Sequence, residues 1–236
     1  MFETSLASEP SVTVIYEHAD FIVVNKENGV PMHCPSSGLV SLLEARLAYP
    51  LWLLHRLDTA TSGLMVLARS AQVAAIFGHL FSQRLISKYY LALVPSNIKK
   101  KQGHIIGDMQ KARNGSYKLS KSTQNPAITQ FYSCHYLTGL RLALLKPSTG
   151  KTHQLRVACK SLAAPILGDS RYSRQATEAT QRLYLHAHML AFSYQNQHFS
   201  FSCLPEQDDI FDQDRLQHLL HTKLDKSQLS WRCYRA

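Results

Sequence analysis

The alternation of apolar and polar positions along the chain predicts strands that come in pairs. Residues 12–16 and 21–25 are short runs of β-branched and aromatic side chains that flank a polar stretch, which is typical of a β-hairpin. Further runs of strand length follow it at intervals. We expect single strands at 64–68 and 88–94, a strand pair at 127–136 and 140–145 around a turn at Thr138-Gly139, and a late hairpin of 190–194 with 198–201.

Helical spacing of apolar residues separates these strands. Residues 39–49 are one candidate helix, ended by Pro50, and residues 152–162 are another, followed by Pro165. Between them Ser70 can cap a helix whose apolar face contains Ala74, Phe77, Phe81 and Leu85. Strand pairs mixed with isolated helices predict an α+β fold rather than a regular alternation of strand and helix.

Composition sets the size of the core and the number of units. The chain has 236 residues, of which 45% are apolar, enough for one large or two small domains without disulfides. No repeat, low-complexity segment or clear linker occurs before about residue 205. We expect a main domain over residues 1–205 and a helical, polar C-terminal tail, 206–236, packed on the domain or extending it.

Cysteine usage and the N-terminus exclude several classes of protein. The five cysteines are odd in number and scattered, without the spacing of a zinc site or of a secreted disulfide framework. The first eleven residues lack a signal-peptide pattern, and no run of 18 apolar residues occurs. We therefore expect reduced thiols in a cytoplasmic protein, with no metal and no membrane span.

Positive charge is concentrated in the body of the chain. The formal net charge is +10, and the 110 residues between Asp58 and Asp169 contain 15 Lys or Arg but one acid, Asp108. Residues 99–125 are polar, begin with three consecutive lysines and predict a mobile basic loop or hairpin. A solubilising surface is the simpler interpretation. The nearly acid-free stretch favours RNA or DNA, whose phosphates attract such chains through counterion release.

Asp58 heads this stretch in an unusual local setting. It precedes the turn Thr61-Ser62-Gly63 and the strand expected at 64–68, so its side chain is placed at the edge of a rigid loop. An Asp followed by Thr and Ser is often only a turn former. Asp58 by itself therefore leaves a structural and a catalytic role open.

Four ordered segments resemble one known family. The motif His55-Arg56-Leu57-Asp58-Thr59-Ala60-Thr61-Ser62-Gly63-Leu64 resembles the catalytic motif of the RluA-type pseudouridine synthases. The remaining segments are Val23-Val24-Asn25-Lys26, Lys88-Tyr89-Tyr90-Leu91-Ala92 and Gly150-Lys151-Thr152-His153-Gln154-Leu155-Arg156-Val157, and the resemblance extends over residues 12–204. Four motifs in order are far more specific than any one of them.

The resemblance implies the pseudouridine synthase fold and isomerisation of uridine in ribosomal or transfer RNA, without metal or cofactor. It implies that Asp58 is the catalytic carboxylate and that Tyr90 stacks on the target base. Arg156 is implied as the partner that keeps Asp58 ionised and oriented. Arg56 resembles the arginine that enters the RNA stack when the base is flipped out.

The chemistry requires residues of these types. Breaking a glycosidic bond and rejoining the base through carbon needs a nucleophile or an electrostatic stabiliser beside the ribose, and a carboxylate can serve as either. Whether Asp58 attacks the sugar, attacks the base or assists a glycal intermediate stays open. Tyr90 as a base for the carbon-bound proton ranks second, because an ordinary phenol is a poor base at neutral pH.

Two alternatives remain beside an active synthase. One is a catalytically silent RNA-binding or assembly protein on the same fold, and the presence of Asp58, Tyr90 and Arg156 argues against it. The other is a glycoside hydrolase, which ordinarily needs two facing carboxylates. Only Asp108 and Asp169 are nearby, and we expect Asp169 to be structural.

The remaining candidates concern RNA phosphates and the histidines. We expect RNA contacts from a set of basic residues, and a protein that acts as a monomer. His55, His153 and His186 are interpreted as packing or hydrogen-bonding residues, because none has a ligand partner at metal spacing. The basic set comprises Arg56, Lys88, Lys99, Lys100, Lys101, Lys111, Arg113 and Lys151.

Overall fold

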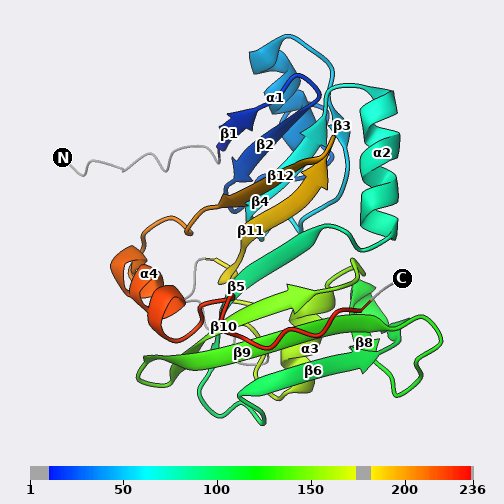
Figure 1. Ribbon diagram of the computed structural model, residues 1–236. Coiled ribbons are helices and arrows are strands. Elements are labelled where there is room, and N and C mark those ends of the chain that lie inside the picture. Colours follow the sequence, from blue (N-terminus) through cyan, green and yellow to red (C-terminus); the bar gives the residue numbers. More distant parts are fainter. Residues whose placement is uncertain (1–10, 174–181, 235–236) are drawn as a thin grey trace.

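A ten-stranded sheet organises the computed structural model, which describes residues 11–173 and 182–234 (Figure 1). Parts of both expected units, 1–205 and 206–236, therefore lie outside the described residues. The main path of the sheet runs β1 (Val12–Glu17), β2 (Phe21–Lys26), β4 (Ser62–Ala68), β11 (Leu185–Tyr194), β5 (Ser87–Pro95), β10 (Leu140–Pro147), β9 (Ala127–Leu137) and β6 (Gln102–Gly107).

Two further strands lie off this path. The short β3 (Trp52–Leu53) pairs with β4, and β12 (Gln197–Ser202) pairs with β11. Strand pairs between described residues are antiparallel except where β11 meets β4 in a parallel contact of two residue pairs. A mixed, mainly antiparallel sheet with helices on its faces confirms the predicted α+β class, and β1–β2, β9–β10 and β11–β12 confirm the three predicted strand pairs.

Three helix boundaries differ from those predicted. The first helix, α1, is Leu39–Leu47, because Ala48 adopts a left-handed conformation that ends it before Pro50. The second, α2, is Ala71–Ser82, with the predicted cap from Ser70, so Leu85 lies beyond it and is exposed. The third, α3, is Gln154–Ser161 and starts after His153, whose φ of 56° is left-handed.

Residues 99–125 are more ordered than a loop. Within them β6 is a full edge strand that pairs with β9, while β7 (Met109–Lys111) and β8 (Tyr117–Leu119) form a separate two-stranded ribbon joined by a 3-10 turn, η1 (Arg113–Gly115). The β7–β8 ribbon confirms the hairpin alternative, whereas the mobile-loop alternative was wrong for β6. An edge strand with one face in solvent carries many polar residues and so lacks the apolar run that identifies a central strand.

The two ends of the sheet are covered by different elements. In Figure 1, α2 lies against β4 and its neighbours, and Phe77 of this helix packs on Phe21 and Phe192 of the sheet. At the other end α3 lies behind the strands, while the C-terminal segment crosses in front, with Trp231 packed edge-on against Tyr89 and Tyr132. The sheet is thereby shielded on both faces near β9 and β10.

Residues after 205 contact this sheet at several points. The helix α4 (Gln213–Thr222) follows a turn in which Tyr136 donates its hydroxyl proton to the carbonyl of Ile210 at 2.7 Å. Further along, the amide of Gln130 pairs with the backbone of Arg232 through two hydrogen bonds of 2.7 and 2.8 Å. The division at residue 205 stays a prediction. No helix among the described residues is long and apolar enough to cross a membrane.

Gly63 permits the close contact between β4 and β11. Its φ is 116°, and a Cβ atom at this position would lie 2.4 and 2.5 Å from the backbone O and N of Ala187. Both atoms are backbone of a central strand and have little freedom to move. Any side chain at residue 63 would therefore push apart the two strands next to the loop that carries Asp58.

We predict that Gly63→Ala lowers the free energy of unfolding by about 3 kcal/mol or more, from left-handed strain and overpacking together. Gly139→Ala is the matched control, because Gly139 has a φ of 78° and no atom within 4 Å of the added Cβ. The control should lose only about 1 kcal/mol, the cost of the backbone strain. Equal losses in urea unfolding of the two variants would show that the contact with Ala187 is unimportant.

Candidate active site

Asp58 lies in the loop between β3 and β4, and hydrogen bonds to backbone carbonyls of this loop hold it in place. Its carbonyl accepts a hydrogen bond from the N–H of Thr61 at 2.9 Å. The fully buried Lys26, at the end of β2, donates its Nζ to the carbonyls of Thr59 and Val30, each at 3.0 Å. Burial lowers the pKa of Lys26 to about 8, against the opposing effect of the Asp58 charge. The lysine thus ties the loop to the first hairpin.

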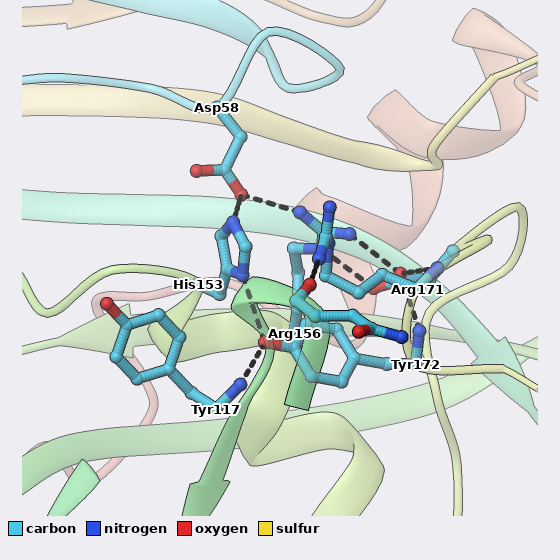
Figure 2. Close-up of polar contacts among 8 residues, drawn as sticks. Asp58, Tyr117, His153, Arg156, Arg171 and Tyr172 are labelled. Carbon is cyan, nitrogen blue, oxygen red and sulfur yellow. Dashed lines mark hydrogen bonds and ion pairs between the residues drawn. The ribbon is translucent and has the colours of Figure 1, made fainter. Parts of the chain in front are cut away.

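Arg156 is the direct partner of Asp58. Its Nη1 donates to Oδ2 of Asp58 at 3.0 Å, while its Nε and Nη2 donate to the two oxygens of Asp169 at 2.9 and 2.8 Å (Figure 2). The paired bonds to Asp169 fix the plane of the guanidinium. One N–H of Nη1 then points at Asp58 in a fixed direction.

Asp169 is the anchor of this arrangement. Its side chain is completely buried, and it also accepts hydrogen bonds from the backbone N–H groups of Arg171 and Tyr172, each at 3.1 Å. Burial would lower the pKa of Arg156, but hydrogen bonds and charge from Asp169, and then from Asp58, raise that pKa above its ordinary value. The guanidinium stays charged between two carboxylates. These contacts agree with the expectation that Asp169 is structural.

A cleft of about 320 Å³ opens above Asp58. The described residues that line it include five cations, Arg56, Arg84, Lys88, Lys151 and Arg156, and a single acid, Asp58. The volume is at the lower end of the range for small-ligand pockets. A cleft with one carboxylate among cations suits a single nucleotide of an anionic polymer.

Tyr90 and Lys88 reach the cleft from alternate positions of β5. Tyr89 between them faces the other side of the sheet, where its ring meets Trp231 with the two ring centroids 5.3 Å apart. Burial and then the charge of Asp58 raise the pKa of the Tyr90 phenol above its ordinary value. Burial lowers the pKa of Lys88 to about 8. A phenol that holds its proton so firmly is a poor base, which further weakens the second-ranked role for Tyr90.

The expected RNA-binding residues fall into two groups. Arg56, Lys88 and Lys151 line the cleft, whereas the other five members of the set do not. The backbone N–H of Lys99 bonds to the carbonyl of Leu162, at the end of α3 that lies opposite His153. Eight helical residues span about 12 Å, so the three consecutive lysines lie well away from Asp58. Lys111 and Arg113 belong to the β7–β8 ribbon and its turn.

Two cleft residues were missed by the sequence analysis. Arg84 follows α2 in a left-handed conformation, and no motif marked it. His153 was grouped with the packing histidines, yet its Nε2 lies 3.9 Å from Oδ2 of Asp58. Its place inside the motif of residues 150–157, three residues before Arg156, was the available signal.

His186 is buried and His55 is partly buried, and both are hydrogen-bonded in the described structure. His55 accepts the N–H of Val66 at 3.2 Å, and His186 contacts the hydroxyl of Ser62 at 2.9 Å through Nδ1. Burial lowers the pKa of each to about 3, so both rings are neutral. Among the described residues, no group of three or more His, Cys, Asp or Glu could hold a metal ion.

A basic cleft that contains one carboxylate held by an arginine is typical of an enzyme that acts on a nucleic acid. Three comparisons with known proteins identify its family. A family model described as RNA pseudouridylate synthase matches residues 20–161. A Haemophilus influenzae protein named "uncharacterized RNA pseudouridine synthase" is 49% identical over 93% of this chain and 99% of its own length.

More distant relatives agree with this match. The dual-specificity RNA pseudouridine synthase RluA of Vibrio vulnificus is 33% identical over 84% of each chain. The structure of human RNA pseudouridylate synthase domain containing 1 superposes with a TM-score of 0.72 at 26% identity, covering 91% of this chain and 96% of that one. The chain belongs to the RNA pseudouridylate synthase family, in its RluA-type branch, and has the pseudouridine synthase fold.

Proposed function

We propose that this protein isomerises uridine to pseudouridine in ribosomal or transfer RNA, with Asp58 as the catalytic carboxylate. The observation that carries the proposal is the position of Asp58: it is the single acid among the described residues of a basic cleft, and Arg156 holds one of its oxygens at 3.0 Å. A carboxylate held in this way is ready to act beside the ribose without first rearranging.

In this proposal the two oxygens of Asp58 have different roles. Oδ2 is held by Arg156, and Oδ1 accepts no hydrogen bond from the described residues. Oδ1 is therefore the oxygen available to the substrate. It can add to the sugar or the base as a nucleophile, or assist a glycal intermediate. The arrangement supports a catalytic carboxylate in each of these cases.

Tyr90 and Arg56 would handle the flipped base. The aromatic ring of Tyr90 borders the cleft beside Asp58, in a position suited to stack on a uracil. Arg56 is exposed at the rim, two residues before Asp58, and can fill the gap that the base leaves in the RNA. Extruding a base costs a few kcal/mol, which such contacts offset. No metal or nucleotide cofactor takes part in this scheme.

The cations outside the cleft would bind flanking phosphates. Lys111 and Arg113 belong to the β7–β8 ribbon and its turn, Lys99 to Lys101 lie near the end of α3, and none of the five lines the cleft. Phosphate contacts of this kind position an RNA without reading its sequence. We propose that the protein works in the cytoplasm as a monomer.

Asp58→Asn should abolish isomerisation and preserve the fold. The amide keeps the size of the side chain but removes the charge and the nucleophile, so the single-turnover rate should fall by at least about a thousandfold. Arg156 still has its paired bonds to Asp169, which should maintain the site and the RNA affinity. The measurement is tritium release from RNA labelled at carbon 5 of uracil, beside an RNA-binding assay.

The control for this variant is Asp209→Asn, which alters an exposed carboxylate in the tail and should leave the rate unchanged. Tritium release by Asp58→Asn at near the parental rate would show that Asp58 is not the catalytic residue. The silent-binder alternative would not explain such a result either, because it requires an inactive parent.

Replacing Lys99, Lys100 and Lys101 together with Gln should weaken RNA binding and leave the chemistry intact. The slope of log affinity against log salt should become shallower by up to about 0.7 to 0.9 for each phosphate that the protein no longer neutralises. The single-turnover rate at saturating RNA should stay at the parental value, because these residues lie at the far end of α3.

Arg56→Ala provides the contrast for the triple variant, since it removes a cation from the cleft. We expect it to slow turnover of structured RNA more than turnover of an unpaired oligonucleotide, which has less stacking to lose. An unchanged salt slope in the triple variant would show that Lys99–Lys101 do not touch RNA. Equal losses on both substrates would reduce Arg56 to a phosphate contact.

A further inference from the structure

His153 lies against the same oxygen of Asp58 that Arg156 holds. Its Nε2 is 3.9 Å from Oδ2, and Nη1 of Arg156 is 3.0 Å from that atom (Figure 2). Both side chains are largely buried, with 16% of the histidine and 19% of the aspartate side chain exposed. Oδ2 is thus flanked by two nitrogen-bearing groups from the start of α3.

A chain of hydrogen bonds favours one position of the proton on the ring of His153. The backbone N–H of Tyr117, on β8, donates to the hydroxyl oxygen of Tyr172 at 2.9 Å. That hydroxyl lies 2.9 Å from Nδ1 of His153. Because a backbone N–H already occupies the oxygen as a donor, the hydroxyl proton is free to point at Nδ1, which accepts it. A neutral imidazole then carries its proton on Nε2, facing Asp58.

Packing keeps the ring of His153 in this orientation. Its backbone is left-handed, with a φ of 56°, a conformation that costs free energy in a non-glycine residue and is common at functional sites. The rings of Tyr117 and Tyr172 meet it edge-on, with centroids 5.8 and 5.7 Å away. Burial lowers the pKa of His153, with the Asp58 charge acting against this effect, so the neutral form is favoured.

We infer that His153 is a positioning residue, which donates Nε2–H to Oδ2 of Asp58 as a second donor beside Arg156 and so directs Oδ1 at the uridine. The inference rests on the proposed role of Asp58. A separation of 3.9 Å is longer than a hydrogen bond, and catalytic hydrogen bonds often shorten only when substrate fills the site. Tyr172 acts through His153 by selecting the tautomer.

Two hydrogen-bonding faces of one carboxylate oxygen would thereby be occupied. A carboxylate with a single partner can still rotate about its Cβ–Cγ bond, whereas two donors on Oδ2 restrict that rotation. The gain is expected in the chemical step and not in RNA affinity, because both donors are directed at Asp58. Loss of the His153 donor should therefore lower the rate of the chemical step and leave RNA binding unchanged.

The test compares four variants in single-turnover tritium release at saturating RNA. His153→Ala should slow release about 10- to 100-fold with RNA affinity within about twofold of the parent, the range typical for partners that orient a reactive group. His153→Gln, whose amide can donate to Asp58, should recover the rate to within about fivefold of the parent. Tyr172→Phe keeps the ring and should slow release about tenfold.

The fourth variant, His153→Ala with Tyr172→Phe, should be no slower than His153→Ala alone, because Tyr172 has no further effect once the imidazole is gone. The matched control is the pair His104 and Tyr234, whose ring nitrogen and hydroxyl are also 2.9 Å apart but lie on the edge strand β6 and the C-terminal segment. His104→Ala and Tyr234→Phe should keep the parental rate. Circular dichroism and urea unfolding show that each variant is folded.

The outcomes separate this inference from the proposed function. If the parent releases tritium and His153→Ala releases it at the same rate, the inference alone would be overturned. Additive losses in the double variant, or no recovery in His153→Gln, would also overturn it, because a purely structural role produces that pattern. A parent that releases no tritium would overturn the proposed function and this inference with it.

Discussion

The guanidinium of Arg156 between two carboxylates is the interaction on which the site depends. A charged group taken out of water is costly unless hydrogen bonds satisfy it, and Arg156 uses Nε, Nη1 and Nη2 on Asp169 and Asp58. Asp169 is buried and cannot face the substrate, so its contribution is to hold the guanidinium. Asp58 is partly exposed and accepts a hydrogen bond from Nη1 of Arg156. The two acids therefore have different roles, determined by burial.

The sheet supplies the other half of this arrangement. Asp58 follows β3 and precedes β4, Arg156 belongs to α3, and Asp169 lies after α3. The three residues therefore meet only when the strands and α3 are in the correct order. Lys26 ties the Asp58 loop to β2, and Gly63 lets β4 approach β11. Lys26 contacts backbone carbonyls, and the approach at Gly63 requires that no side chain is present. Neither contact depends on a second charged group.

Much of this could be read from the sequence, and the reasons for success and failure differ. The strand pairs were predictable because short apolar runs separated by polar turns mark buried strands such as β2 and β10. The motifs led to Asp58, Tyr90 and Arg156, and the structure brings these three residues together, although their roles stay predictions. The edge strand β6 was missed because its exposed face is polar. The position of His153 was missed because it depends on the left-handed backbone of His153 itself and on the contact of its ring with Tyr172, neither of which a sequence pattern reports.

Asp169→Asn gives the most direct test of the claim that Asp169 orients Asp58 through Arg156. The substitution keeps the size of the side chain but leaves one of its two guanidinium contacts without an oxygen acceptor. The account predicts that the single-turnover rate of tritium release at saturating RNA falls at least about tenfold, while RNA affinity is unchanged, at a temperature where circular dichroism shows the variant folded. A folded Asp169→Asn variant that works at the parental rate would contradict the account.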